Sequence, residues 1–228
     1  MASQLRGDPQ PGVLSSSLGE MEIYAFLLAA QAEECDGDGV RQHISRVSEL
    51  VGRMVRLLGV QDVPERRLWA TGSFLHDVGK MHVSREVLRK PGALDAFERK
   101  LVEGHCQYGY AILSEYTERL KQTAEFWATS AEIALTHHEN WDGSGYPGHL
   151  AGLDIPMAGR VVRLADVFDA LTSPRVYHAA ISKDEAVRRM RSEEFRGVFD
   201  PQLFEVFLSA LDLPGRALGA RTGGVTGE

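Results

Sequence analysis

Apolar residues recur at three- and four-residue spacing through most of this chain, and this spacing limits the fold more than any other feature. The pattern is clearest between residues 44 and 58, where one helical face carries Ile44, Val47, Val51, Met54, Val55 and Leu58. The alternation of apolar and polar residues that is typical of strands is never sustained, and no internal repeat is present. The sequence therefore predicts a single all-α domain.

Residues that start or stop helices divide this pattern into segments. Helices are predicted over residues 20–34, 66–76, 123–138, 160–172 and 201–211. Ser84 and Ser182 are expected N-caps, and Asp95 with Glu98 predicts a capping box for the helix that carries His105. Residues 1–19 and the tail 213–228 are expected to be disordered, which leaves residues 20–212 as the predicted domain.

Composition excludes some classes of function. The chain has 228 residues, a net charge of -7 and 43% hydrophobic residues, which is ordinary for a globular protein and argues against nonspecific nucleic-acid binding. Cys35 and Cys106 form no disulfide framework, and Cys106 is expected to be a buried thiol on another helical face than His105. No signal peptide is recognised, and the apolar run 23–32 is too short for a membrane span, so the cytoplasm is the expected location.

Metal-binding side chains lie within or at the ends of several predicted helices. The candidate ligands are His43, His76, Asp77, His105, His137, His138 and Asp166. A single histidine beside an apolar face is more often a hydrogen-bonded structural residue, but an unpaired carboxylate is costly to bury. Together the imidazoles and carboxylates form a donor set that suits Fe, Mn, Zn, Ni or Co. Asp77 is the natural bridge between two ions, because its carboxylate has two oxygens.

A glycine-rich stretch follows the paired histidines, with the sequence HHENWDGSGYP over residues 137–147. Its glycines allow a backbone to approach a ligand closely. The simpler alternative is a mobile surface loop, although Trp141 and Tyr146 are costly side chains to leave exposed.

These residues occur in an order that resembles a known family. His76-Asp77-Val-Gly-Lys80 is similar to the motif of the HD phosphohydrolase superfamily. The run His138-Glu139-x-x-Asp142-Gly143-x-Gly145-Tyr146-Pro147 resembles, more narrowly, the HD-GYP family of cyclic di-GMP phosphodiesterases. The resemblance covers roughly residues 22–212, whereas the His-Asp pair alone would be a weak signal.

The resemblance implies a helical bundle around two divalent metal ions, with iron or manganese expected first. One ion would be bound by His43, His76, Asp77 and Asp166, and the other by Asp77, His105, His137 and His138. A water bridging the two ions would attack the phosphorus of cyclic di-GMP. Lys80 and Asp77 are the expected catalytic residues, with Lys80 stabilising charge on the phosphate.

The same resemblance assigns substrate contacts and orienting residues. The expected substrate contacts come from Tyr146, Arg175 and the backbone at Gly143 and Gly145. Asp142 and Asp169 are expected to orient histidines. A diguanylate cyclase, or a sensory or receiver protein, is the expected protein partner, and the apolar segment 23–30 suggests a homodimer.

Two positions depart from the family pattern. Gly39 stands where members with a third metal carry glutamate, which favours two ions and the linear dinucleotide pGpG as product. His178 stands where a basic residue is usual, which weakens one phosphate contact. Two alternatives stay open: a catalytically weak module that binds cyclic dinucleotides in signalling, and a phosphohydrolase of mononucleotides or other phosphoesters.

Overall fold

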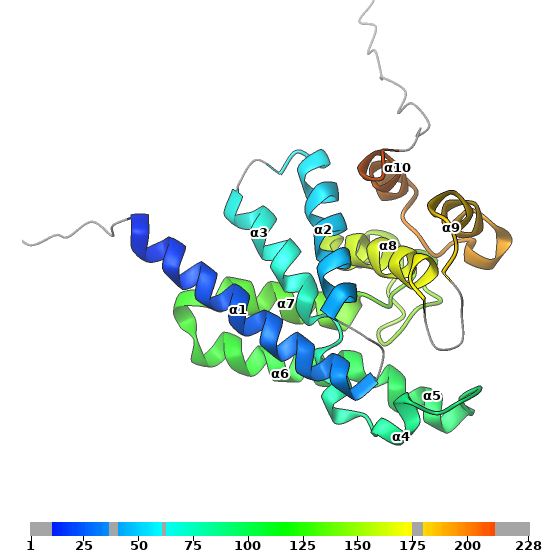
Figure 1. Ribbon diagram of the computed structural model, residues 1–228, viewed down its shortest axis with the longest axis horizontal. Helices are drawn as coiled ribbons and strands as arrows, with labels where there is room; N and C mark the ends of the chain where they lie inside the picture. Colours follow the sequence, from blue (N-terminus) through cyan, green and yellow to red (C-terminus); the bar gives the residue numbers. More distant parts are fainter. Residues whose placement is uncertain (1–10, 37–40, 61–62, 175–179, 213–228) are drawn as a thin grey trace, which may run out of the picture.

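The computed structural model describes residues 11–36, 41–60, 63–174 and 180–212, and the statements below refer to these residues. They form α-helices and short 3-10 turns without a strand, apart from an isolated β-bridge between Asp142 and Ala151 (Figure 1). The prediction of a single all-α domain is confirmed.

The helices follow one another with short connections. In chain order they are α1 (Pro11–Asp36), α2 (Arg41–Leu57), α3 (Val63–Gly72), α4 (Arg85–Leu88), α5 (Ala96–Glu103), α6 (His105–Arg119), α7 (Ala124–Thr136), α8 (Met157–Thr172), α9 (Lys183–Met190) and α10 (Pro201–Ala210). The 3-10 turns η1 (Ser73–Leu75) and η2 (Val78–His82) flank the His-Asp pair, and η3 (Lys121–Thr123), η4 (Gly152–Asp154) and η5 (Glu193–Phe195) lie in later connections.

Several predicted helix boundaries are met and two are wrong. Ser84 and Ser182 accept backbone hydrogen bonds as N-caps, and Asp95 with Glu98 forms the predicted capping box. That box starts α5, which ends at Glu103, so His105 begins a new helix instead of lying within the same one. The first helix begins at Pro11, earlier than the residue 20 predicted, and residues 1–10 and 213–228 lie outside the described part.

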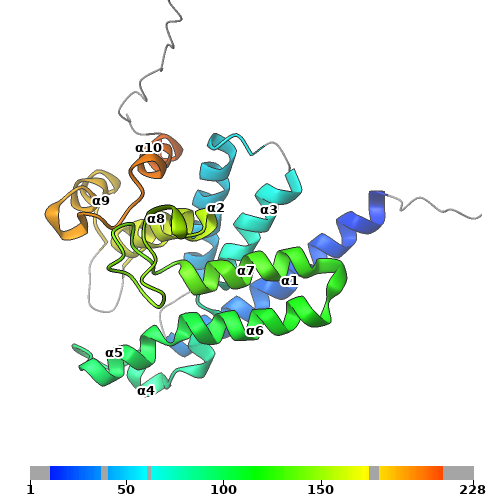
Figure 2. The ribbon, with the colours of Figure 1, turned by 180° about the vertical axis from the view of Figure 1, so that it is seen from behind.

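Two apolar clusters form the core. One joins α2, α8, α9 and α10 around residues such as Val47, Leu164 and Phe207. The other joins α1, Ile44 at the start of α2, η1, η2, α6 and α7 around residues such as Leu75 and Trp127. Figures 1 and 2 show α6 and α7 side by side, with α1 crossing the outside of this pair. Because α2 contributes to both clusters, its N-terminal end lies where they meet.

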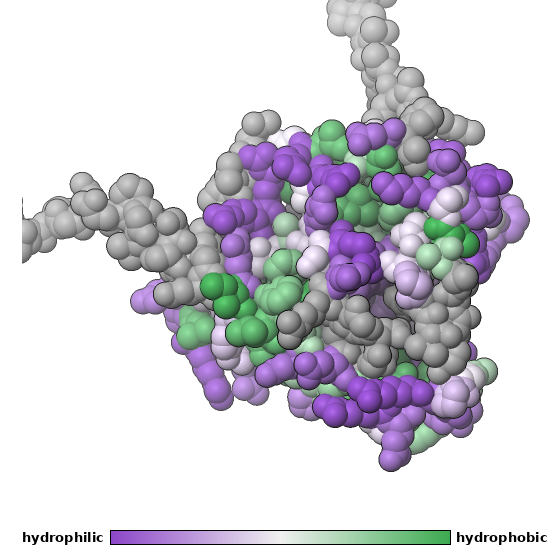
Figure 3. All heavy atoms as spheres, viewed as in Figure 1, coloured by the Kyte–Doolittle hydropathy of each residue, from purple (hydrophilic) through white to green (hydrophobic). Residues whose placement is uncertain are grey.

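One face of α1 is buried and another is exposed. Ala25 and Ala29 pack into the core, whereas Ile23, Tyr24 and Leu27 are exposed. Figure 3 shows hydrophobic side chains gathered over this part of the molecule, between strongly hydrophilic regions. Within the described residues, no helix is both long and apolar enough to cross a membrane.

Candidate metal centre

Asp77 is the centre of a group of side chains contributed by five separate elements. It lies between η1 and η2, directly after His76. His43 comes from α2, His105 from the first residue of α6, His137 from the end of α7 and Asp166 from α8. The structure thus brings together residues that are far apart in the sequence, at the junction of the two apolar clusters.

A close backbone contact positions the Asp77 turn against α6. Gly79 packs so tightly there that a Cβ atom at this position would lie 1.9 Å from the carbonyl oxygen of His105. No side chain fits in that space. Gly79 therefore allows η2 to approach the start of α6, which brings Asp77 to His105.

One half of the centre consists of His43, His76 and Asp166. The Nε2 atoms of His43 and His76 face each other at 3.3 Å, and His43 Nε2 lies 3.7 Å from Asp166 Oδ1. His76 Nδ1 donates to the Ser73 carbonyl at 2.7 Å. With a neutral ring, this leaves the lone pair of His76 Nε2 directed at His43.

Asp169 fixes the orientation of His43, as predicted. His43 Nδ1 donates to Asp169 Oδ2 at 2.7 Å, and Arg46 binds both oxygens of the same carboxylate. Burial opposes ionisation of Asp169, but His43 and Arg46 outweigh it and lower its pKa to about 2. The ionised carboxylate holds the His43 ring so that Nε2 points into the centre.

The other half of the centre contains His105 and His137. Their Nε2 atoms face each other at 3.3 Å. His105 Nδ1 donates to the Val102 carbonyl at 2.6 Å, and His137 Nδ1 donates to the Ala134 carbonyl at 3.0 Å. Burial lowers the pKa of His137 to about 4, so its ring is neutral near pH 7 and has a lone pair available.

His138 differs from the other histidines because of Arg163, a residue that the sequence did not single out. Arg163 on α8 donates to His138 Nδ1 at 3.2 Å and also binds Asn140 Oδ1. A guanidinium only donates, so Nδ1 of His138 must accept. Burial and the neighbouring histidines hold the pKa of His138 well below its usual range, so the neutral ring carries its proton on Nε2.

Cys106 is buried, but its predicted orientation is wrong. It was expected on another helical face than His105, yet its Sγ lies 3.6 Å from His105 Nε2. The potential ligand atoms of His105, Cys106, His137 and His138 all lie within 4.8 Å of one another. The thiol is therefore part of the centre.

The Asp77 carboxylate contacts both halves. Oδ2 lies 3.3 Å from His76 Nε2 and 2.9 Å from Lys80 Nζ, and Oδ1 lies 3.2 Å from His105 Nε2. Burial raises the pKa of Asp77, but Lys80 and His76 outweigh burial and hold it well below its usual range. Burial also disfavours a charged His76, yet Asp77 raises the pKa of His76 to about 9.

These contacts fit metal ions. Asp77 Oδ1 is buried without a hydrogen-bond partner, and two pairs of histidine Nε2 atoms converge at 3.3 Å. Two nitrogens on one tetrahedral ion lie about 3.4 Å apart when each metal–nitrogen distance is about 2.1 Å. Nitrogen lone pairs that face each other at this spacing are stabilised by a cation between them. If His76 holds a proton on Nε2, a metal ion that binds there would displace it.

The glycine-rich loop is pinned against the centre by Glu139. This buried carboxylate accepts from the backbone N–H groups of Gly148 at 2.6 Å and Leu150 at 3.1 Å. The Tyr146 ring stacks on His138 with centroids 4.7 Å apart, so one face of Tyr146 covers a predicted ligand. The loop is thus held by hydrogen bonds and ring packing, which argues against a mobile surface loop.

The predicted roles of the loop glycines are met in part, and that of Asp142 is wrong. Gly143 has a φ of 81°, and a Cβ at Gly145 would lie 2.3 Å from the backbone nitrogen of Asn140. Both glycines are needed for the loop's path, and contact with a substrate stays a prediction. Asp142 is exposed and accepts from the Ser144 backbone N–H at 2.9 Å, so it stabilises the turn and orients no histidine among the described residues.

Three positions with predicted roles lie outside the described residues. They are Gly39, Arg175 and His178. The expected phosphate contact of Arg175 and the two departures from the family pattern therefore stay predictions.

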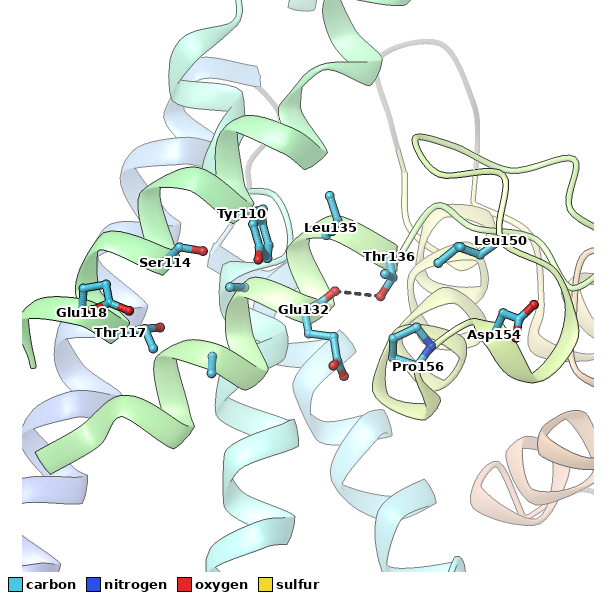
Figure 4. Close-up of a pocket in the computed structure, with 12 residues that line it drawn as sticks. Tyr110, Ser114, Thr117, Glu118, Glu132, Leu135, Thr136, Leu150, Asp154 and Pro156 are labelled. Atoms are coloured by element: carbon cyan, nitrogen blue, oxygen red, sulfur yellow. Dashed lines mark hydrogen bonds between the residues drawn. The ribbon is translucent and has the colours of Figure 1, made fainter. Parts of the chain in front are cut away.

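An open hollow of about 500 Å³ lies away from the metal centre, between α6, α7 and the segment before α8 (Figure 4). Its wall includes the carboxylates of Glu118, Glu132 and Asp154. Three acidic side chains repel a phosphate ligand. We therefore place the candidate site at the Asp77 cluster and not in this hollow.

Comparison with known proteins now defines the class. A family model described as "HD domain" matches residues 23–203. The chain belongs to the HD-domain family. Its predicted kinship with HD-GYP proteins is confirmed by its curated relatives. A solved HDG"Y"P protein from Bdellovibrio bacteriovorus has a similar fold, with a TM-score of 0.57 and 21% identity over 75% of this chain and 51% of that one. At that identity the solved protein supports the fold alone.

Two curated relatives come from Vibrio cholerae. A 3'3'-cGAMP-specific phosphodiesterase 2 is 39% identical over 183 residues, which is 80% of this chain and 34% of the relative. A cyclic di-GMP phosphodiesterase is 40% identical over 197 residues, which is 82% of this chain and 39% of the relative. The chain therefore spans less than half the length of these two relatives.

Proposed function

We propose that this chain is a metal-dependent phosphodiesterase that hydrolyses cyclic di-GMP, mainly to linear pGpG. The observation that carries the proposal is the arrangement around Asp77, where an unpartnered carboxylate oxygen faces convergent histidine nitrogens. Such a donor set suits two transition-metal ions that share one carboxylate. The names of the two Vibrio cholerae relatives support cyclic dinucleotides as the substrate class.

In this proposal the ions are held by the residues predicted from the sequence. His43, His76 and Asp166 would hold one ion, His105, His137 and His138 the other, and Asp77 would bind both. When bound, the ions supply Lewis acidity and a water of lowered pKa next to the phosphate. We take iron or manganese as the expected metals, since imidazole and carboxylate suit both.

The exposed edge of the centre defines where a substrate would approach. The side chains of His43, Asp166 and Lys80 are 16%, 14% and 17% exposed, whereas those of His76 and His137 are fully buried. A phosphate would therefore approach the centre from the side on which these three side chains are exposed. The Lys80 ammonium, held 2.9 Å from Asp77 Oδ2, would stabilise negative charge that develops on the phosphate.

Substrate selectivity within the class is a separate part of the proposal. The relatives include enzymes named for cyclic di-GMP and for 3'3'-cGAMP. We retain cyclic di-GMP because the loop with Gly143, Gly145 and Tyr146 follows the HD-GYP pattern. A homodimer through the exposed face of α1, a diguanylate cyclase or sensory partner, and a cytoplasmic location are further parts of the proposal.

Product analysis tests this function. Protein purified without oxygen and loaded with iron or manganese should convert cyclic di-GMP to pGpG, while chelator-treated protein should not. Lys80→Met should lower the rate by about 10²-fold, the order expected when one charge-stabilising donor is lost. Asp154→Asn, in the acidic hollow, is the control and should keep the wild-type rate.

The same assay separates the competing functions. Loaded protein that binds cyclic di-GMP but releases no linear dinucleotide would support a binding module and contradict the enzyme. Faster release from 3'3'-cGAMP than from cyclic di-GMP would overturn the choice of substrate while leaving the chemistry in place. Hydrolysis of mononucleotides alone would support the general phosphohydrolase.

A further inference from the structure

Arg163 on α8 is a cation beside the metal centre that has no carboxylate partner. Its Nε and Nη2 donate to the side-chain carbonyl of Asn140 at 3.2 and 3.0 Å, and its Nη1 donates to His138 Nδ1 at 3.2 Å. Among the described residues, no carboxylate forms an ion pair with Arg163. By contrast, Arg160, one turn earlier on the same helix, pairs with Asp200 at 2.6 Å.

The missing anion matters because the guanidinium is largely withdrawn from water. Arg163 is only partly exposed, and a charge removed from water is costly unless an opposite charge compensates it. Asp166 lies one turn further along α8, but the proposed function assigns its carboxylate to a metal ion. The two ions would add positive charge nearby and raise the cost further. An anion bound at Arg163 would offset both contributions.

The position of Arg163 gives such an anion a way in. Arg163 precedes Asp166 by three residues, so the two side chains lie on one face of α8. Asp166 belongs to the exposed edge by which a phosphate would approach. His138 and Tyr146, whose rings stack with centroids 4.7 Å apart, are partly exposed as well. Arg163 therefore lies at the rim of the site, beside the opening.

The guanidinium also retains donors for an anion. An arginine has five N–H groups in one plane. Three of them are used by Asn140 and His138, which leaves one on Nη1 and one on Nη2. Two N–H groups on neighbouring nitrogens can bind two oxygens of one phosphate, and this pairing makes arginine a strong phosphate ligand.

We propose that Arg163 binds the second phosphate of a cyclic dinucleotide, the one that is not cleaved. This inference rests on the proposed phosphodiesterase function. The reacting phosphate is assigned to the ions and to Lys80, so a separate cation at the rim is available for the other one. The ring of a cyclic dinucleotide keeps its two phosphates close together. Arg163 would thus favour dinucleotides over ligands that carry a single phosphate.

Equilibrium binding of pGpG and GMP to Mn²⁺-loaded protein tests the proposal without relying on turnover. Linear pGpG is the proposed main product and keeps both phosphates, whereas GMP has one. In calorimetric titrations, Arg163→Met should bind pGpG about 10- to 100-fold more weakly than the wild type, the range for one charge-assisted hydrogen bond. Its affinity for GMP should be unchanged. Arg163→Lys keeps the charge but loses the planar pair of donors, so its affinity for pGpG should lie in between.

Arg119→Met is the matched control. It removes the same charge from the end of α6 opposite His105, where the Arg119 side chain is 76% exposed, and should leave both affinities unchanged. Circular dichroism shows whether Arg163→Met is folded. If it is not, Arg163→Lys decides, and wild-type affinity for pGpG in that variant would contradict the proposal.

The outcomes separate this inference from the proposed function. Equal losses for pGpG and GMP in folded Arg163→Met, or no loss for either, would overturn the role of Arg163. A wild type that binds pGpG no more tightly than GMP would overturn it too. Conversion of cyclic di-GMP to pGpG would leave the proposed enzyme intact in each case. A wild type that cleaves no cyclic di-GMP would overturn the proposed function, while the binding comparison would still decide whether Arg163 recognises a second phosphate.

Discussion

The two halves of the candidate metal centre share Asp77 but are built differently. In the half with His43, His76 and Asp166, called here the carboxylate half, oxygen donors accompany the imidazoles, and Asp169 orients His43. In the half with His105, Cys106, His137 and His138, called here the thiol half, a buried thiol lies beside the imidazoles and Arg163 occupies one histidine nitrogen. His43 and Asp166 of the carboxylate half are partly exposed, whereas His105 and His137 of the thiol half are buried.

This difference suggests a division of labour between the two ions. Oxygen donors and partial exposure suit the ion that meets the phosphate, whereas buried imidazole donors suit an ion that stays in place. The shared carboxylate couples the two halves. Substitutions in one half should therefore affect one ion first, and only Asp77 should affect both equally.

The largest effect is expected from Asp77→Asn. The amide offers one carbonyl oxygen and no charge, so the bridge between the halves is lost. Binding of both ions and hydrolysis of cyclic di-GMP should each fall by at least ~10²-fold. Calorimetric titration with Mn²⁺ measures the binding, and wild-type affinity in this variant would contradict a bridging role.

Single substitutions in each half should remove different ions. His43→Gln should lose the ion of the carboxylate half, and His137→Gln that of the thiol half, because each change removes one imidazole ligand. Elemental analysis after dialysis should find one ion per chain in either variant. When Co²⁺ and Mn²⁺ are offered together, His43→Gln should retain Co²⁺ and His137→Gln should retain Mn²⁺. Identical metal content in the two variants would show that the two halves are equivalent.

Asp169→Asn should have a smaller effect, confined to the carboxylate half. An amide binds His43 Nδ1 less strongly and leaves Arg46 without its anionic partner. Loss of such an orienting partner costs ~10–100-fold in metal affinity. Titration with Mn²⁺ should show one weakened site and one unchanged site. A change in both sites would mean that Asp169 supports the whole fold and not one ligand.

The smallest effect is expected from Arg163→Met in the thiol half. Removing a buried cation near the centre favours a bound dication, and His138 Nδ1 is no longer forced to accept. Affinity for the second ion should rise by roughly ten-fold, which corresponds to about 1.4 kcal/mol. Titration with Co²⁺ measures this rise, and weaker binding would show that Arg163 holds His138 as a ligand.

The fold and the order of the ligands could be predicted from the sequence because their signals are local. Helical spacing marks α2 and α8, and the pair His76-Asp77 lies in a short motif whose Gly79 permits the contact with α6. The break between α5 and α6 was missed, because Gly104 continues the helical pattern without a stop residue such as proline.

The thiol half was less predictable for a physical reason. Sequence spacing places Cα atoms on a helix but does not fix the direction of a side chain in the first turn, so the inward position of Cys106 could not be foreseen. Arg163 lies on the same helix as Asp166, yet its contact with His138 depends on how α7 and α8 pack. Asp142 was misassigned because its hydrogen bond is to the adjacent turn.

The central claim is that one chain holds two ions joined by Asp77, and native mass spectrometry of metal-loaded protein tests it most directly. The expected spectrum shows two ions per chain in the wild type and none retained in Asp77→Asn under the same conditions. A wild type that carries one ion or three, or an Asp77→Asn variant that retains two, would contradict the account.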